Sequence, residues 1–166
     1  FRKLRSVLGD MRHAVSIERW GPKLSERVFW RAPTAELRIA LTFDDGPHAV
    51  STRRILEVLR ALAVPATFFL VGKNIKTHLA AARDIVESGH EVGNHTYGHV
   101  RLSFSTDEKI RDEITRTDEL IRNIDGGQPR FLRRPFGLFT RRVLNVIEGM
   151  GYHTVVGDVY PRDPHH

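Results

Sequence analysis

Hydrophobic and polar positions alternate along the chain in a pattern that predicts strands followed by helices. Segments with apolar residues at helical spacing alternate with short continuous apolar runs, and such runs are typical of strands buried on both faces. The predicted strands cover residues 38–43, 66–71, 91–94, 130–133 and 152–156, and the predicted helices cover 51–62, 75–86, 105–124 and 140–147. Because the two types alternate, we expect an α/β domain with a parallel sheet or barrel covered by helices.

Turn and capping residues mark the ends of several elements. Residues 44–47, Asp-Asp-Gly-Pro, predict a turn after the first strand. Ser51 or Thr52 is predicted to cap the first helix, and residues 105–108 read as a capping box for the longest one. Thr140 is the predicted cap of the last helix.

Composition is that of an ordinary folded domain. The chain has 166 residues, of which 40% are hydrophobic and 28% are charged, and this excludes a disordered or collagen-like chain. No apolar run approaches the ~20 residues of a membrane span, so we predict no transmembrane segment. The chain has no cysteine, which excludes disulfides, zinc–thiolate sites and cysteine nucleophiles.

Positive charge is concentrated at the start of the chain. The net charge is +6, and residues 1–31 hold eight basic and three acidic side chains. This segment lacks the aromatic–basic interleaving of nucleic-acid binders, so we predict no nucleic-acid partner. No apolar stretch follows the basic start, so it is not predicted to be a signal peptide. We expect residues 1–36 to form an N-terminal extension and 37–166 the main domain.

Polar residues cluster where the predicted strands end. In parallel α/β folds, the carboxyl ends of the strands share one rim, and that rim carries the chemistry. Every predicted strand except the second is followed by charged or imidazole side chains, namely Asp44, Asp45, His95, His99, Arg133, Arg134, Asp158 and Asp163. We therefore expect a functional site at this rim.

Two histidines and two carboxylates of this rim suggest a metal site. His95 and His99 are four residues apart and can face one ion, although such a pair alone could be two loop histidines. Asp44 and Asp45 end a buried strand, where carboxylates are costly unless a positive charge compensates them. A His-His-Asp set with open positions is the arrangement of a catalytic metal site, and the second carboxylate would be a general base.

Three motifs make a resemblance specific. They are residues 42–47 (TFDDGP), 93–99 (GNHTYGH) and 131–137 (FLRRPFG). In these motifs, and from about residue 38 to 163, the chain resembles the polysaccharide deacetylase family (NodB-homology domain, carbohydrate esterase family 4). The resemblance implies a distorted (β/α) barrel, here incomplete, with about five strand–helix units visible.

The resemblance also implies roles for individual residues. Asp45, His95 and His99 would bind a divalent metal ion, most often zinc. Asp44 would act as the base on a metal-bound water, Arg133 would pair with that base, and Asp163 would orient Arg133. A backbone N–H near Phe136 would stabilise the oxyanion, and Phe136, Tyr97 and His48 are predicted to contact substrate.

The chain departs from the family pattern in several places. Arg134 and Phe136 replace the usual Pro and Tyr of the third motif, and Pro164 replaces a Trp after Asp163. The family's last motif, a Leu-x-His that supplies the general acid, is not found before His166. The general acid is therefore unassigned, and we expect the catalytic domain to be truncated at its C-terminus.

These observations predict a hydrolase of carbon–nitrogen bonds other than peptide bonds. It would remove N-acetyl groups from a GlcNAc-containing polysaccharide, such as peptidoglycan or chitin, by attack of a metal-bound water. The resemblance implies an extracytoplasmic location. One alternative is a catalytically impaired carbohydrate-binding homologue without the general acid. Another is a deacetylase or amidohydrolase for O-acetyl or non-sugar amide substrates.

Overall fold

The computed structural model describes residues 27–30, 34–36, 38–127, 129–137 and 140–157. Within these residues, six parallel strands form one sheet in the order β1-β6-β5-β4-β3-β2. The strands are β1 (Val28–Phe29), β2 (Thr42–Gly46), β3 (Thr67–Leu70), β4 (Glu91–Asn94), β5 (Phe131–Leu132) and β6 (His153–Val155). The helices are α2 (Ser51–Leu62), α3 (Gly72–Thr77), α4 (Leu79–Glu87), α5 (Asp107–Asp125) and α6 (Arg141–Gly149).

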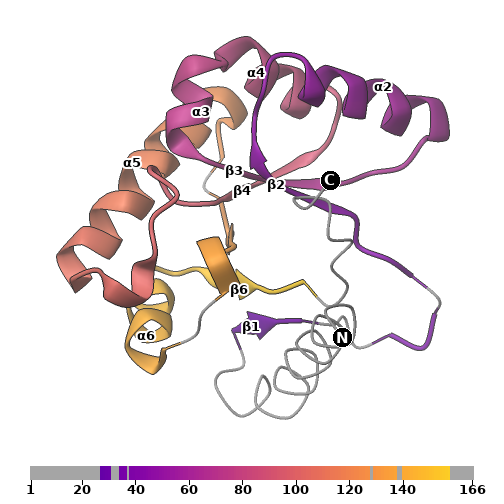
Figure 1. The fold of residues 1–166 in the computed structure, drawn as a ribbon. Coiled ribbons are helices and arrows are strands. Elements are labelled where there is room, and N and C mark those ends of the chain that lie inside the picture. The colour runs from indigo at the N-terminus through magenta and orange to yellow at the C-terminus, as the bar shows by residue number, and fades with distance from the viewer. Residues whose placement is uncertain (1–26, 31–33, 37, 128, 138–139, 158–166) are drawn as a thin grey trace, which may run out of the picture.

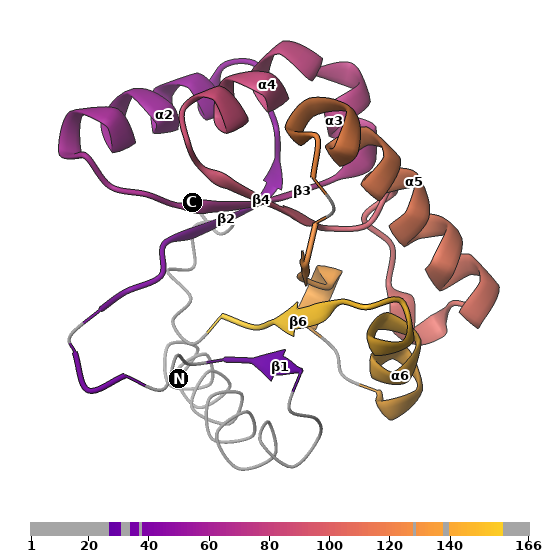
Figure 2. The same cartoon turned by 180° about the vertical axis from the view of Figure 1, so that it is seen from behind.

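The helices cover one side of a curved sheet. Figures 1 and 2 show α2, α3 and α4 over strands β2–β4, while α5 and α6 continue along the same side toward β6. Two short 3₁₀ helices, Leu102–Phe104 and Pro135–Gly137, lie in the connections. The predicted α/β class with a helix-covered parallel sheet is confirmed. None of the described helices is both long and apolar enough to cross a membrane.

Strand β1 was not predicted from the sequence. Val28 and Phe29 lie in the segment that we assigned to the N-terminal extension, yet Val28 pairs with Thr154 of β6. The Phe29 ring also lies 4.9 Å from the ring of His153. Two residues are too few to show a periodic pattern, so only the pairing with β6 reveals this strand.

Strand β2 differs from its prediction in a way that matters for the site. The predicted strand was residues 38–43 followed by a turn, whereas the observed strand continues through Asp44, Asp45 and Gly46. Ile39 is 94% exposed, and pairing of this run with β3 begins only at Thr42. The register against β3 shifts between Phe43 and Gly46, and such bulges re-aim side chains.

Three helix predictions also need correction. The predicted helix 75–86 is divided into α3 and α4 at His78, whose φ of −125° and ψ of 48° are not helical. Neither Ser51 nor Thr52 caps α2; the Thr52 hydroxyl instead accepts a hydrogen bond from the His48 N–H. Helix α5 is capped by Thr106 rather than by a box starting at residue 105. The predicted Thr140 cap of α6 is confirmed.

Helix α5 joins the two halves of the core. One buried cluster lies between α2, α4 and strands β3 and β4, and Ile121 of α5 belongs to it. The other lies around β5 and α6 and includes Ile110 and Ile114 of α5. All three isoleucines are fully buried. The helix is therefore anchored along its length, directly beside the ends of β4 and β5.

A glycine in β4 offers a test of this packing. A Cβ added to Gly93 would lie 2.7 Å from the ring of Phe69, which is buried. We expect Gly93→Ala to lower the free energy of unfolding by about 1–3 kcal/mol, the usual cost of overpacking. Urea denaturation would measure this. The control is Gly149→Ala, because an added Cβ there meets nothing within 4 Å. Equal stabilities of the two variants would contradict the packing.

Candidate metal and catalytic site

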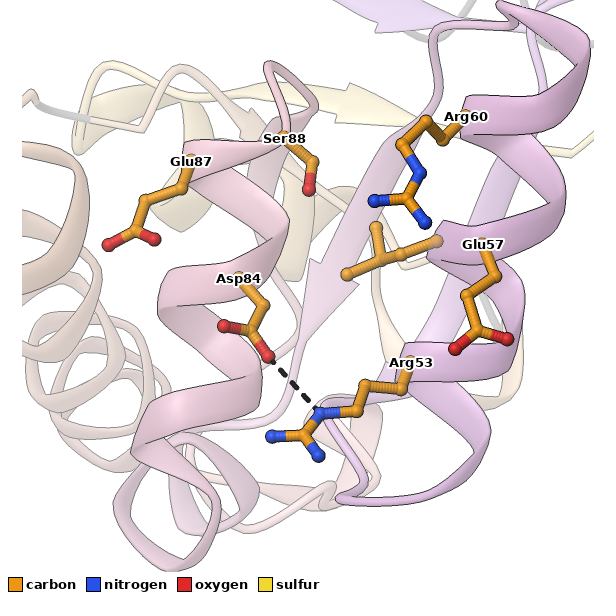
Figure 3. Close-up of a pocket in the computed structure, with 7 residues that line it drawn as sticks. Arg53, Glu57, Arg60, Asp84, Glu87 and Ser88 are labelled. Atoms are coloured by element: carbon orange, nitrogen blue, oxygen red, sulfur yellow. Dashed lines mark ion pairs between the residues drawn. The ribbon is translucent and has the colours of Figure 1, made fainter.

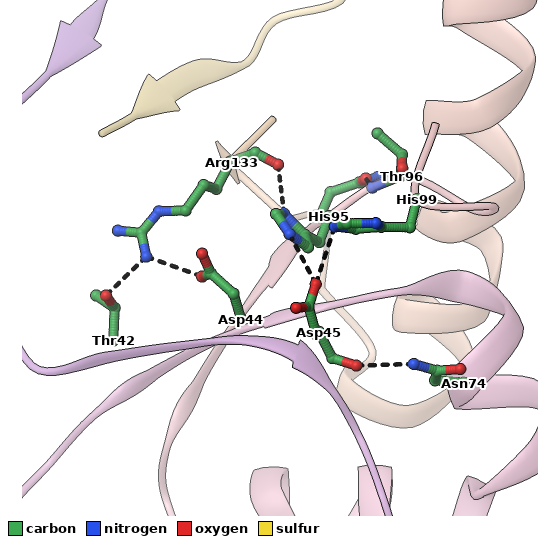
Figure 4. A network of polar contacts seen from close by, with 9 residues as sticks. Thr42, Asp44, Asp45, Asn74, His95, Thr96, His99 and Arg133 are labelled. Atoms are coloured by element: carbon green, nitrogen blue, oxygen red, sulfur yellow. Dashed lines mark hydrogen bonds and ion pairs between the residues drawn. The ribbon is translucent and has the colours of Figure 1, made fainter. Parts of the chain in front are cut away.

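Asp45, His95 and His99 converge at the carboxyl ends of β2 and β4, as Figure 4 shows. Asp45 Oδ1 lies 3.0 Å from His99 Nε2 and 3.3 Å from His95 Nε2. The three potential ligand atoms lie within 4.8 Å of one another. The structure thus brings together the three residues that the sequence predicted as metal ligands.

A left-handed backbone conformation and a hydrogen bond from helix α3 position Asp45. Its φ of 66° is in the left-handed region, which is unfavourable for a non-glycine residue and is concentrated at functional sites. The Asn74 amide of α3 donates to the Asp45 carbonyl at 2.7 Å. The bulge and this hydrogen bond turn the Asp45 carboxylate toward the histidines.

His95 is the buried member of the three candidate ligands. Its backbone N–H donates to the Leu70 carbonyl of β3, and its side chain is only 3% exposed. Ring atom Nδ1 lies 2.7 Å from the Arg133 carbonyl. Because a carbonyl can only accept, Nδ1 carries the hydrogen, and the neutral ring then has its lone pair on Nε2.

The tautomer of His95 indicates whether the site suits a metal ion. The unprotonated Nε2 of His95 faces a carboxylate oxygen, so two acceptors point at one another. Such an arrangement requires an added proton or a cation between them. Two imidazole nitrogens and one carboxylate oxygen are a donor set that suits zinc with an open position. The residues therefore fit a divalent ion.

Hydrogen bonding also keeps Asp45 ionised. The pKa of Asp45 lies well below its ordinary value, chiefly because His95 hydrogen-bonds to the carboxylate whenever its Nε2 carries the added proton, and next because of His99. Partial burial of the carboxylate acts in the opposite direction. An ionised Asp45 is the form that coordinates a metal.

Asp44 and Arg133 form a second contact beside the triad. Arg133 Nη1 donates to Asp44 Oδ1 at 2.8 Å and to the Thr42 hydroxyl at 2.7 Å. The guanidinium also lies over the Phe69 ring, 4.3 Å from its centroid. Arg133 thus contacts both predicted parts of the site: its carbonyl holds His95 and its guanidinium holds Asp44 (Figure 4).

The Arg133 side chain has one further donor. Its Nε is buried and has no hydrogen-bond partner among the described residues. Asp163, which the sequence analysis assigned to this arginine, lies outside the described residues, as does Asp158. Arg134 is buried, and this burial lowers its pKa to about 10.

The predicted substrate contacts fall in different surroundings. Phe136 is 52% exposed, and its ring centroid is 4.8 Å from that of His99. The Arg101 guanidinium lies over the Phe136 ring, 4.8 Å from the ring centroid. The Tyr97 ring lies under the Arg116 guanidinium, 3.5 Å away. His48 is exposed, with its ring 5.3 Å from that of His78. Substrate contact by these three residues stays a prediction.

Sequence reasoning missed a group of buried polar residues behind the metal ligands. The Asn94 amide donates to the Asp118 carboxylate at 2.6 Å, and its oxygen accepts from the Thr96 N–H at 2.8 Å. Tyr152 also donates to Asp118. Burial raises the pKa of both Asp118 and Tyr152. Asp118 lies on the buried face of α5. An acidic residue at a position where the helical spacing calls for an apolar one was the signal in the sequence that could have revealed it.

A pocket elsewhere in the molecule contains none of the predicted site residues. It lies between α2 and α4 and is lined by charged side chains of both helices, as Figure 3 shows. Arg53 Nε and Asp84 Oδ2 approach to 3.6 Å across it. Its cations and carboxylates are mixed, so it offers no single charge to a ligand.

Comparisons with known proteins agree with the geometry. Residues 31–155 match the family model described as polysaccharide deacetylase. The chain is 39% identical over 105 residues to a peptidoglycan-N-acetylglucosamine deacetylase of Bacillus cereus, covering 63% of this chain and 38% of that protein. It is 36% identical over 126 residues to a chitooligosaccharide deacetylase of Azorhizobium caulinodans, covering 75% of this chain and 60% of that protein.

A solved structure shows the same likeness in three dimensions. The structure of a family 4 carbohydrate esterase from Bacillus anthracis superposes with a TM-score of 0.77 at 35% identity, covering 82% of this chain and 67% of that one. The chain therefore belongs to the polysaccharide deacetylase family. It spans less than two thirds of the length of either curated relative described above.

Proposed function

We propose that this protein is a metal-dependent deacetylase that removes N-acetyl groups from a GlcNAc-containing polysaccharide of the peptidoglycan or chitin type. The observation that carries the proposal is the meeting of acceptor atoms from Asp45, His95 and His99 beside the Asp44–Arg133 pair. The names of the relatives support the substrate class. Peptidoglycan lies outside the cytoplasm, so we also propose an extracytoplasmic location.

The cofactor is proposed to be zinc, held by Asp45, His95 and His99. A divalent ion bound there would lower the pKa of a water molecule and polarise an acetyl carbonyl. The open coordination positions that a three-residue set leaves are those that water and substrate need.

Asp44 is the proposed general base. Its Oδ1 accepts from Arg133 at 2.8 Å, so Oδ2 is the atom available to take a proton from the attacking water. Arg133 orients this carboxylate, and Thr42 and the Phe69 ring hold the guanidinium in place. The proton then remains on Asp44 Oδ2 while the amide carbon becomes tetrahedral.

The turn at Phe136 is the proposed site of oxyanion stabilisation. The Phe136 ring lies against His99, so the turn that carries it runs beside the metal ligands. A backbone N–H of this turn would donate to the developing oxyanion, a contact that is strongest in the transition state. Phe136 is half exposed between His99 and Arg101, and we propose that its exposed part contacts a sugar.

The proposal is tested by measuring acetate release. The protein with Zn²⁺ is incubated separately with an N-acetylglucosamine oligomer and with peptidoglycan. We expect acetate from at least one of them, loss of activity with a chelator, and recovery on adding Zn²⁺. Bound zinc with no acetate from either substrate would favour the carbohydrate-binding alternative. An O-acetylated sugar is supplied in a third incubation, and acetate from that sugar alone would favour an esterase.

Arg133→Lys tests the support of the base. Lysine keeps the charge but cannot donate to Asp44 and Thr42 in the geometry of a guanidinium. We expect kcat to fall about 10–100-fold, the usual loss for a residue that orients a reacting group, while zinc affinity is retained. If Asp163 acts through Arg133, Asp163→Asn should add little to Arg133→Lys in a double-mutant cycle. Fully additive losses would refute that coupling.

A further inference from the structure

Glu113 is a buried carboxylate that the reaction itself does not use. It lies on α5 between the core residues Ile110 and Ile114, and its side chain is 3% exposed. Burying a carboxylate is costly unless it is paired and hydrogen-bonded. A further apolar residue would suit this face of the helix, so the contacts of Glu113 must account for its presence.

Both oxygens of Glu113 have partners. Oε2 accepts from the backbone N–H of Gly98 at 2.6 Å, and Oε1 lies 2.9 Å from Lys109 Nζ one turn earlier on α5. The pKa of Lys109 is raised, first by its hydrogen bond to Glu113. Lys109 balances the charge, and the contact with Gly98 reaches the segment that carries the histidines.

That segment is strained on both sides of Gly98. Thr96 has φ 66° and His99 has φ 54°, both in the left-handed region that non-glycine residues seldom adopt. Conformations of this kind persist only where surrounding contacts hold them. At the Asn94 end, the Asn94 side chain binds the Thr96 N–H. At the His99 end, the Glu113 carboxylate binds the backbone N–H of Gly98, the residue directly before His99.

The two ligand histidines are therefore held in different ways. His95 is fixed through its own ring by the Arg133 carbonyl. The His99 side chain is 32% exposed, and its ring packs against those of His95 and Phe136. Charge-assisted hydrogen bonds are about twice as strong as neutral ones, so Glu113 is the strongest described restraint on the backbone next to His99.

We propose that Glu113 is a positioning residue for the metal site: its carboxylate holds the Gly98 peptide so that His99 Nε2 faces Asp45. The inference rests on the proposed metal centre, and it adds a residue to that centre. It assigns to α5 a role in metal affinity that neither the motif residues nor the exposed surface of the site reveals.

The experiment compares three variants of the full chain. Glu113→Leu fills the space but accepts no hydrogen bond, Glu113→Gln keeps an acceptor oxygen, and Asp112→Asn is the control. Asp112 is the neighbouring carboxylate, which also pairs with Lys109 but faces solvent. Zinc affinity is measured by competition with a chromophoric chelator, and the Co²⁺ absorption spectrum reports on ligand geometry.

We expect Glu113→Leu to weaken zinc binding about 10–100-fold, as loss of a group that supports a ligand usually does, and to change the Co²⁺ spectrum. Glu113→Gln should restore affinity to within a few-fold of the unmodified protein, and Asp112→Asn should leave it unchanged. A folded Glu113→Leu protein with unchanged zinc affinity would overturn the role of Glu113 and leave the proposed function intact. Failure of the unmodified protein to bind zinc would refute the metal centre itself.

Hydrogen exchange decides the question if Glu113→Leu does not fold. The Gly98 amide of the unmodified protein should be protected and shifted downfield in the ¹⁵N–¹H spectrum, because it donates to a buried carboxylate. Exchange at the rate of an exposed loop amide would overturn the proposal without any variant.

Discussion

His99→Ala is expected to abolish activity by removing one of three metal ligands. Structural zinc sites bind with about 10–16 kcal/mol, so one ligand of such a set contributes about 3 kcal/mol, or roughly a hundredfold in affinity. His99 is the better position to test than His95, because the His95 side chain is buried and its Nδ1 satisfies the Arg133 carbonyl. Replacing His95 would remove both a ligand and a buried hydrogen bond.

The measurement is zinc content together with zinc affinity. We expect the unmodified protein to hold one zinc ion and His99→Ala to lose it on dialysis. Thermal denaturation without metal should change little, since a partly exposed side chain is removed. The control is His78→Gln, because His78 lies outside the cluster of potential ligands. Stoichiometric zinc of undiminished affinity in His99→Ala would refute the proposed site.

Asp44→Asn is expected to remove catalysis while leaving the metal in place. Asparagine has nearly the shape of aspartate, but its amide cannot accept a proton from water at the operating pH. General bases contribute about 10²–10⁴ in rate, so we expect kcat to fall by that factor. Asp44 is outside the cluster of potential metal ligands, so zinc affinity should stay within a few-fold.

Steady-state kinetics separate this effect from lost substrate binding. A fall in kcat with little change in KM means that the lost interaction is specific to the transition state. The matched control is Asp84→Asn, which removes an exposed carboxylate of α4 that pairs with Arg53 away from the site. Activity of Asp44→Asn equal to that of Asp84→Asn would show that another group is the base.

The sequence allowed the candidate site residues to be grouped because they follow strand ends and are of types that can carry chemistry. Asp45, His95 and His99 do converge, as do Asp44 and Arg133, although 50 residues separate Asp45 from His95. Parallel strands bring their carboxyl ends to one rim whatever the length of the connecting helices. The alternation of strands and helices was therefore enough to predict a common rim, whereas the resemblance to the family assigned Asp45 to the metal and paired Asp44 with Arg133.

Backbone detail at the same rim was not predictable from the pattern. Residues 44–47 were expected to form a turn, yet Asp44 and Asp45 belong to β2 at a register shift, with Asp45 at φ 66°. Successive side chains of a regular strand point to opposite faces. The register shift lets the adjacent residues Asp44 and Asp45 reach the same site, Asp45 at the histidines and Asp44 at Arg133. Pairing with β3 decides where that shift lies.

Contacts between distant segments decided the rest. Glu113 and Asp118 read as polar positions in a helix, and they gain a role only because α5 packs beside the end of β4. Val28 and Phe29 form a strand only because β6 offers an edge to pair with. The sequence by itself determined the class of fold and the common rim of the candidate site residues, since these follow from local periodicity and strand direction. The tertiary structure decided how each ligand is aimed and held, because buried hydrogen bonds and strand register depend on neighbours that local sequence does not specify.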